Sequence, residues 1–217
     1  MYFFDLDGTL LDSNGVWLDI DIAFLGKLGV SPVPEDYTEY VTHHSFPASA
    51  QYTKERFQLA LAWEEIAAAW QDMALAAYSG QLELKPGAKE FLLRARRAGV
   101  PCGLITSCMP HLTRAALERH GLAPLLDPVL IAGELGMEKR DPGLYRRLAA
   151  EAGLEPGDCV LFDDSPVYLA AAKEAGWRVY GVADPIFAGR EEEFSALCGP
   201  EGYPFSFFGP HRAENSS

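Results

Sequence analysis

Two carboxylates separated by a single residue lie near the start of the chain, at Asp5 and Asp7. They follow residues 1–4, an apolar run long enough for one buried strand, and they precede a glycine that permits a turn with positive φ. Ligands of open α/β sheets bind beyond the carboxyl ends of the strands. We therefore expect this acidic pair to lie in a functional site and not in an ordinary surface turn.

Three further groups of polar residues follow predicted strands or lie in the loops beyond them. They are Thr106 with Ser107, Lys139, and Asp163 with Asp164. A parallel sheet brings the carboxyl ends of its strands to one edge. These residues can therefore converge with the acidic pair, although they are far apart in the sequence.

A cluster of carboxylates with one lysine and a hydroxyl suits a particular chemistry. Hard oxygen ligands favour Mg²⁺, which keeps water ligands and bridges to a substrate phosphate. A lysine and a threonine hydroxyl near the start of a helix are good partners for phosphate oxygens. A carboxylate can also attack a phosphoryl group and form an aspartyl-phosphate. The residue types thus favour phosphoryl transfer, which needs mainly positioning and charge neutralisation.

Strand and helix patterns alternate over the second half of the chain. The spacing predicts strands at 100–106, 128–131, 158–162 and 178–182, and helices at 88–98, 111–120, 143–152 and 166–175. This alternation indicates right-handed βαβ units on a parallel sheet. The fold class is therefore α/β, with a Rossmann-like parallel sheet.

Residues 14 to about 80 carry helical patterns without a strand signal, so a helical block is inserted after the first strand. Helices are predicted over 48–61 and, as the last of the block, from Trp63 to Tyr78, with Ile66, Trp70 and Met73 on one stripe. We expect this stripe to be the core of the inserted block and not a cofactor-binding surface.

Four short motifs occur in order along the chain. They are DLDGTL at 5–10, LITS at 104–107, GMEKRDP with Lys139 at 136–142, and FDDS at 162–165. In these motifs the chain resembles the haloacid dehalogenase (HAD) superfamily, in its branch of small phosphatases and phosphomutases with a helical cap.

The resemblance implies three parts. Residues 1–13 plus 84–185 would form a discontinuous HAD-like α/β core, and residues 14–83 an α-helical cap. Residues 186–217 would be a partly irregular C-terminal extension, whose aromatic residues could pack on their own core or on a partner subunit.

The resemblance also implies a role for each acidic residue near the chain start. Asp5 would be the nucleophile that accepts the phosphoryl group, and its second oxygen would bind Mg²⁺. Asp7 would protonate the leaving alcohol and then activate water, while its backbone carbonyl would be a metal ligand.

The remaining motif residues would hold the phosphoryl group and the metal. Thr106 would hydrogen-bond the phosphoryl group, helped by the backbone N–H of Ser107. Lys139 would hold the nucleophile and the phosphate together. Asp164 would coordinate Mg²⁺ directly, and Asp163 directly or through water.

Each of these groups has a purely structural alternative. The hydroxyl pair alone would be a helix N-cap, the acidic pair at 163–164 could cap the helix that follows, and an isolated lysine is most often solvated.

Two positions also depart from the family pattern. Arg140 stands where the family has proline and could contact substrate or face solvent. Tyr168 stands where Asp or Asn is common, which puts in doubt one secondary contact to the metal or its waters.

Asp7 discriminates between reactions within the superfamily. A family dehalogenase lacks an acid here because halide leaves without a proton, whereas an alkoxide leaving from a phosphate ester benefits from one. We therefore expect a Mg²⁺-dependent phosphomonoester hydrolase acting on a small phosphorylated metabolite. The alternatives are a sugar phosphomutase similar to β-phosphoglucomutase, in which a sugar hydroxyl replaces water, and a non-catalytic binding protein on this scaffold.

The cap would decide the substrate. Its candidate contacts are His43 and His44, in the break before Pro47, with Lys54 and Arg56. A histidine pair in a loop is more often at the surface than in a site, so both interpretations stay open.

The overall composition limits the partners. Eighteen Lys and Arg against 31 Asp and Glu give a formal net charge of −13, which argues against nucleic acid or an anionic membrane. No run approaches the about 20 apolar residues of a membrane span, and the first residues lack the basic region of a signal peptide. Four cysteines without a Cys-x-x-Cys pair are typical of a reduced, cytoplasmic protein. The oligomeric state is open.

Overall fold

The computed structural model of the chain describes residues 1–44 and 46–207. Within them the chain forms two compact units. One, the core unit, contains residues 1–14 and the described residues from 82 onward. The other, the cap unit, is a single insertion of residues 15–81.

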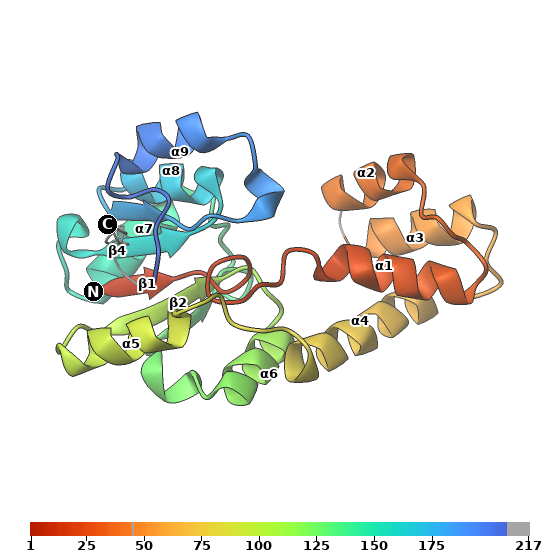
Figure 1. The fold of residues 1–217 in the computed structure, drawn as a ribbon, viewed down its shortest axis with the longest axis horizontal. Helices are drawn as coiled ribbons and strands as arrows, with labels where there is room; N and C mark the ends of the chain where they lie inside the picture. The colour runs from red at the N-terminus through yellow and green to blue at the C-terminus, as the bar shows by residue number, and fades with distance from the viewer. Residues whose placement is uncertain (45, 208–217) are drawn as a thin grey trace, which may run out of the picture. The chain divides into compact units, whose positions relative to one another are not determined.

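The core unit is built on a five-stranded parallel sheet (Figure 1). Its strands are β1 (Tyr2–Phe4), β2 (Cys102–Thr106), β3 (Val129–Ile131), β4 (Val160–Asp163) and β5 (Arg178–Gly181). Their order is β3-β2-β1-β4-β5, so the chain builds the sheet outward from β1 on one side and then on the other. The α/β class and the parallel sheet predicted from the sequence are confirmed.

β1 is central because its side chains are apolar on both faces. Phe3 and Phe4 are fully buried, and each pairs in register with β2 on one side and β4 on the other. Strand order reverses beside β1, and open α/β sheets bind their ligands at such a crevice. Asp5 follows β1 immediately, so this topology delivers the first carboxylate to that crevice.

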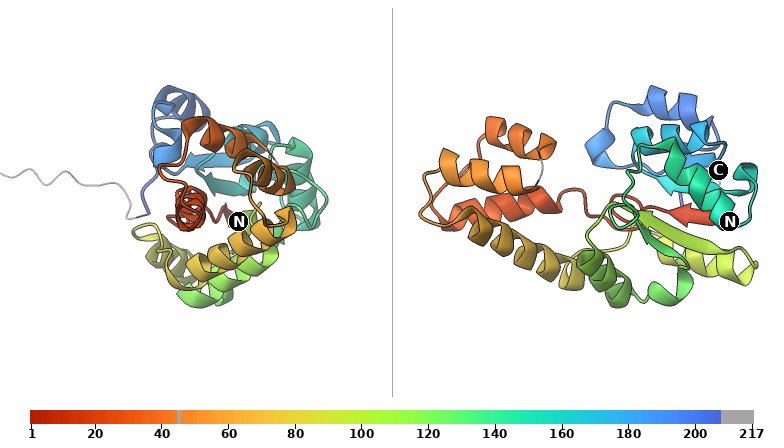
Figure 2. Two further views of the ribbon diagram at one scale, coloured as in Figure 1. Left: turned by 90° about the vertical axis from the view of Figure 1, so that its right-hand side faces the viewer. Right: turned by 180° about the vertical axis from the view of Figure 1, so that it is seen from behind.

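Helices cover both faces of the sheet. They are α5 (Ala88–Arg97), α6 (Pro110–His120), α7 (Pro142–Glu151) and α8 (Pro166–Glu174). Figures 1 and 2 show α5 and α6 on one face and α7 and α8 on the other. Short 3₁₀ turns, η1 (Ala123–Leu125) and η2 (Pro156–Asp158), lead into β3 and β4. The helices expected from the sequence are all present, with ends within one residue or so of those predicted.

The last part of the core unit is more regular than its composition indicates. It contains the 3₁₀ turn η3 (Pro185–Phe187) and the helix α9 (Glu191–Cys198). Beyond α9, the Phe205 ring lies 4.7 Å from Phe162 and the Phe207 ring 5.7 Å from Phe91, both within the core unit. The described aromatic residues of this segment therefore pack on their own core. Phe208 lies outside the described residues.

The described residues of the cap unit form four helices. They are α1 (Val16–Lys27), α2 (Glu35–His43), α3 (Phe46–Arg56) and α4 (Trp63–Gly80). Ile66 and Trp70 of α4 are buried, and Trp70 packs edge-on against Phe24, as the stripe predicts. The helix expected over 48–61 ends earlier, at Arg56. Gln58 takes a left-handed conformation (φ 51°) and the Leu59 N–H bonds back to the Lys54 carbonyl, a Schellman ending without glycine.

A buried polar network joins three of the cap helices. Asp21 of α1 accepts a hydrogen bond from the Tyr37 hydroxyl at 3.1 Å, and the Thr53 hydroxyl lies 3.0 Å from Tyr37. Thr53 in turn donates to the Ser49 carbonyl at 2.7 Å. Burial raises the pKa of Asp21 to about 6, against the opposing hydrogen bond from Tyr37. A protonated Asp21 would complete the network, since each hydroxyl could then donate to the next oxygen along the chain.

We predict that titration of Asp21 lowers the free energy of unfolding as pH rises. Its pKa is about 6 when folded and about 4 when unfolded, so the folded state binds more protons between these values and stability falls through this window. The full loss is at most about 3 kcal/mol. Urea unfolding of Asp21→Asn at pH 4 and 7 should lack this fall. Asp19→Asn, an exposed change on the same helix, should show the same fall in unfolding free energy between pH 4 and pH 7 as the wild type. An equal change of unfolding free energy with pH in all three proteins would contradict the prediction.

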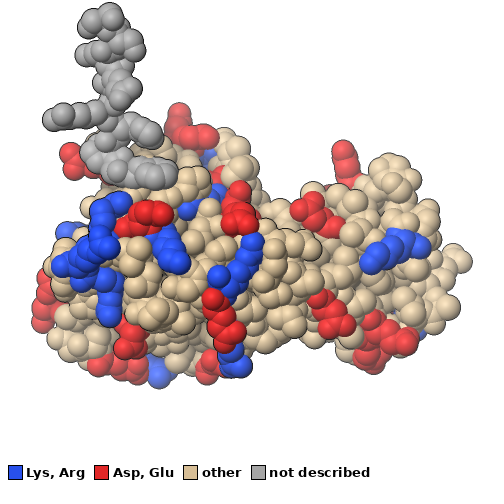
Figure 3. Space-filling view, turned by 60° about the horizontal axis from the view of Figure 1, so that its bottom comes forward, with Lys and Arg blue, Asp and Glu red and all other residues tan. Residues whose placement is uncertain are grey.

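The surface carries both signs of charge. Acidic and basic side chains are interleaved over the face shown in Figure 3. Among the described residues, no helix combines the length and the apolar character needed to cross a lipid bilayer.

Candidate active site

The site begins in the loop that leaves β1. The Leu11 N–H bonds to the Leu6 carbonyl at 2.8 Å, and the Gly8 N–H bonds to the Leu11 carbonyl at 2.9 Å, so the loop folds tightly on itself. Gly8 has a φ of +76°, and a Cβ there would collide with the Asn14 amide and the Asp164 carboxylate. Glycine is therefore needed both for the turn and for close approach to the acidic cluster.

A buried lysine joins two of the carboxylates. Lys139 Nζ lies 2.6 Å from Asp5 Oδ1 and 2.7 Å from Asp163 Oδ2, and the lysine is only 2% exposed. Asp5 and Asp163 lie side by side at the ends of β1 and β4, because the residues before them, Phe4 and Phe162, pair in the sheet. Lys139 comes from the loop between β3 and α7. The sequence expectation that these three groups converge matches their positions in the structure.

The cluster holds more negative charge than its lysine balances. Oxygens of Asp5, Asp163 and Asp164 lie within 4.8 Å of one another. Burial, together with the neighbouring carboxylates, raises the pKa of Asp5 well above its ordinary value although Lys139 opposes this. Burial alone would lower the pKa of Lys139, but Asp163 and Asp5 raise it, so the ammonium stays charged. Burial and Asp163 raise the pKa of Asp164 to about 7.

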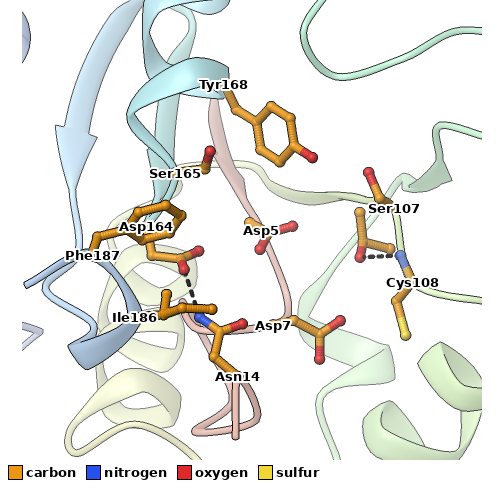
Figure 4. A pocket seen from close by; sticks show the side chains of 11 residues that line it. Asp5, Asp7, Asn14, Ser107, Cys108, Asp164, Ser165, Tyr168, Ile186 and Phe187 are labelled. Atoms are coloured by element: carbon orange, nitrogen blue, oxygen red, sulfur yellow. Dashed lines mark hydrogen bonds between the residues drawn. The ribbon is translucent and has the colours of Figure 1, made fainter. Parts of the chain in front are cut away.

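Asp164 is oriented by two side chains that the sequence reasoning did not assign. The Thr9 hydroxyl donates to Asp164 Oδ1 at 3.2 Å, and the Asn14 amide donates to Asp164 Oδ2 at 2.8 Å (Figure 4). Thr9 lies in the first motif, so the motif could have indicated that Thr9 belongs to the site. Asn14 carries no such signal, because its contact is with a residue 150 positions away.

Asp163 differs from Asp164 in its contacts. Its Oδ1 accepts a hydrogen bond from the Ser165 N–H at 2.8 Å, while its Oδ2 bonds to Lys139. Asp163 thus closes the turn before α8 and pairs with the lysine at the same time. It does not cap α8 itself, whose N-cap residue is Ser165.

Asp7 and Thr106 line the same pocket as the nucleophile candidate, Asp5. Asp7 Oδ1 accepts a 2.6 Å hydrogen bond from the buried Ser13 hydroxyl. The Thr106 hydroxyl accepts from the Cys108 N–H at 3.0 Å, which leaves its own hydrogen to donate elsewhere. Thr106 does not cap α6, whose N-cap residue is Met109.

These groups surround a pocket of about 240 Å³ within the core unit. Figure 4 shows Asp5 at its centre, between Asp7, Asp164 and Ser107. An apolar and aromatic wall completes it, formed by Tyr168, Ile186 and Phe187. The pocket is large enough for a phosphoryl group and a few additional atoms.

Tyr168 and Tyr145 support the buried lysine. Lys139 Nζ lies 4.6 Å from the centre of the Tyr168 ring, close enough for a cation–π interaction. The Tyr145 hydroxyl donates to the Lys139 carbonyl at 2.9 Å. Tyr168, unusual at its position, therefore lines the pocket and packs on the lysine instead of supplying an oxygen ligand.

Arg140 faces solvent. Its side chain is 71% exposed and pairs with Glu138 at 2.7 Å, so of its two alternatives the structure favours the solvated one.

In the cap, His44 is exposed, stacks on Tyr40 and has Nδ1 2.7 Å from the Tyr40 carbonyl. The side chain of His43 lies outside the described residues. A substrate contact by either histidine, or by Lys54, stays a prediction, while Arg56 pairs with Asp36.

Comparison with known proteins identifies the family. The model of the haloacid dehalogenase-like hydrolases matches residues 1–176. An α/β core with acidic strand ends is the architecture that the four motifs predict. The chain belongs to the haloacid dehalogenase-like hydrolase family.

Its relatives include proteins named as phosphatases. A probable pseudouridine-5'-phosphatase from Drosophila melanogaster is 28% identical over 188 residues, covering 84% of this chain and 80% of the relative. A phosphoserine phosphatase from Thermus thermophilus is 40% identical over 100 residues, covering 46% of this chain but only 40% of that protein. The fold is similar to a putative β-phosphoglucomutase from Thermotoga maritima, with a TM-score of 0.77, 22% identity and coverage of 89% and 90% of the two chains.

We predict that Lys139→Met strongly destabilises the core unit. The change leaves Asp5 and Asp163 buried without their cation, and breaking a buried ion pair from one side costs about 3–5 kcal/mol. Thermal and urea unfolding measure this loss. Arg140→Met, the adjacent but exposed change, should stay within about 0.5 kcal/mol of wild type. A loss for Lys139→Met as small as that of Arg140→Met would show that the lysine does not balance the cluster.

Proposed function

We propose that the protein is a Mg²⁺-dependent phosphomonoester hydrolase that acts on a small phosphorylated metabolite through an aspartyl-phosphate. The observation that carries this proposal is the buried cluster of Asp5, Asp163 and Asp164 with the single ammonium of Lys139. The relatives named as phosphatases support the same reaction class.

The donor set fits a hard divalent cation. Carboxylate oxygens are the ligands that Mg²⁺ prefers, and a second positive centre would balance the excess negative charge of the cluster. Asp5, Asp164 and the Asp7 carbonyl would hold the ion, with Asp163 bound directly or through water. When bound, Mg²⁺ would neutralise charge on the phosphoryl oxygens and favour ionised Asp5.

The residues divide the reaction between them. A carboxylate oxygen of Asp5 would attack phosphorus while the bond from phosphorus to the leaving oxygen breaks, and Asp7 would give that oxygen its proton. In the second half, Asp7 would take a proton from water as the water attacks phosphorus and the bond to Asp5 breaks. Lys139 would hold Asp5 in place, and Thr106 and the Ser107 N–H would hold the phosphoryl oxygens.

The position of Asp7 favours ester hydrolysis over dehalogenation. Its carboxyl lines the same pocket as Asp5 and is oriented by Ser13, as a proton donor to a leaving alcohol must be. The substrate is proposed as a small anionic metabolite, not nucleic acid, since the net charge of −13 disfavours a polyanionic partner. A cytoplasmic location would suit such a substrate and the free cysteines.

We predict that Asp5→Asn lowers the rate of Mg²⁺-dependent phosphate release from p-nitrophenyl phosphate by at least about 1000-fold, because the nucleophile is lost. Asp7→Asn should lower turnover by about 100- to 10,000-fold through loss of the general acid and base. Asp158→Asn, an exposed change at the opposite end of β4, should leave the rate unchanged.

A panel of phosphorylated metabolites, assayed for free phosphate and for transferred phosphate, separates the candidates. Phosphate release supports a hydrolase, whereas conversion of a sugar 1-phosphate to its 6-phosphate without release would identify a mutase. No turnover of any substrate with Mg²⁺ would contradict the proposal and favour a binding protein.

A further inference from the structure

The pocket around Asp5 has one wall that the proposed chemistry does not use. Tyr168, Ile186 and Phe187 form this apolar wall, and Figure 4 shows Ile186 and Phe187 beside Asp164. All three residues belong to the core unit, as the acidic cluster does. Under the proposed function the polar lining serves the phosphoryl group and the cation. The apolar wall is therefore left for the alcohol part of a bound phosphate ester.

Ile186 leaves its side chain in water at the pocket. It is 57% exposed, which makes it the most exposed large aliphatic side chain in the described part of the chain. Covering apolar surface that is exposed to water lowers the free energy. A ligand with an apolar alcohol part would cover Ile186 once its phosphoryl group has reached Asp5.

The backbone of Ile186 is fixed although its side chain is exposed. Its N–H donates a 3.1 Å hydrogen bond to Asp184 Oδ1, which caps the turn η3. Asp184 is buried and pairs with Lys85 at 2.6 Å. The turn is thus tied to the interior of the core unit, so little ordering is needed when a ligand packs on this wall.

The two aromatic rings of the apolar wall are also held in place. The Phe187 ring packs edge-on against the buried Phe194, with 6.2 Å between the ring centres. The Tyr168 ring lies over the ammonium of Lys139 at 4.6 Å. Fixed aromatic rings offer large apolar surfaces for another ring or an aliphatic group to pack on.

The described charges around the pocket leave no positive group for a second anion on the substrate. Among the described residues that line the pocket, none is a lysine, an arginine or a histidine. The ammonium of Lys139 is already bonded to Asp5 and Asp163. A bound Mg²⁺ and this lysine would carry three positive charges, whereas the three clustered carboxylates and Asp7 carry four negative charges when ionised. A carboxylate on the alcohol part would therefore be repelled.

We propose that Tyr168, Ile186 and Phe187 determine specificity: they select phosphate esters whose alcohol part is uncharged and apolar or aromatic beside the phosphate. Esters that carry a second anionic group, such as phosphorylated hydroxy acids and bisphosphates, are disfavoured. The inference rests on the proposed function and deepens it, because it names the class of substrate.

Two pairs of esters test the proposal through kcat/KM for Mg²⁺-dependent phosphate release. Phenyl phosphate and 4-carboxyphenyl phosphate differ in charge but release phenols of similar acidity. The wild type should favour phenyl phosphate by about fivefold or more. Benzyl phosphate and ethyl phosphate differ in apolar surface, and the wild type should favour benzyl phosphate by about 10-fold.

Variants of Ile186 connect these preferences to the apolar wall. Ile186→Ala should lower the ratio of benzyl to ethyl phosphate by about fivefold, because apolar contact is lost. Ile186→Lys should shift the other ratio by about fivefold or more toward 4-carboxyphenyl phosphate, because it supplies the missing cation.

Val167→Lys is the matched control. Val167 is 49% exposed and precedes Tyr168 in α8, but it does not line the pocket. It makes the same charge change outside the apolar wall, so both ratios should stay within about twofold of wild type.

The outcomes separate this inference from the proposed function. A wild type that releases phosphate from none of the esters would overturn the proposed function and this inference with it. A wild type that releases phosphate but favours 4-carboxyphenyl or ethyl phosphate would overturn only the role of the apolar wall. The same holds if Ile186→Lys shifts the ratios no more than Val167→Lys does.

Discussion

The site depends on burying several carboxylates around one ammonium. Charges taken out of water are costly unless they are paired and hydrogen-bonded, and Lys139 meets that condition for Asp5 and Asp163 together. The pairing is possible only because β1 and β4 are neighbours in register, so that their last residues lie side by side. The sheet order is therefore a requirement of the electrostatics as much as of the hydrophobic core.

The same constraint explains the residues around the cluster. Gly8 has no side chain because Asn14 and Asp164 occupy the space that a Cβ would take. Tyr168 and Tyr145 support the lysine through its ammonium and its carbonyl, without adding to the negative charge. The loop after β1 is short and internally bonded, so it holds Asp5 and Asp7 at fixed positions, as phosphoryl transfer requires.

The fold and the cluster could be predicted because they follow local patterns. Alternating strands and helices specify a parallel sheet, and residues at strand ends must then meet at one edge. Asn14 could not be found this way, since it is an ordinary polar residue in a loop whose contact with Asp164 joins residues 150 positions apart. The aromatic packing of Phe205 on Phe162 and the early end of α3 at Arg56 also depend on contacts and backbone bonds that periodicity does not encode.

The central place of β1 has a consequence for how the chain is made. β1 is synthesised before its partner strands β2 and β4, which begin at Cys102 and Val160. Until those segments have been synthesised, Phe3 and Phe4 have no sheet to enter, whereas the cap unit is contiguous and meets its own contacts early. Such non-local pairing slows folding and leaves apolar surface exposed meanwhile. The nucleophile candidate is thus synthesised well before the strands that complete its final surroundings.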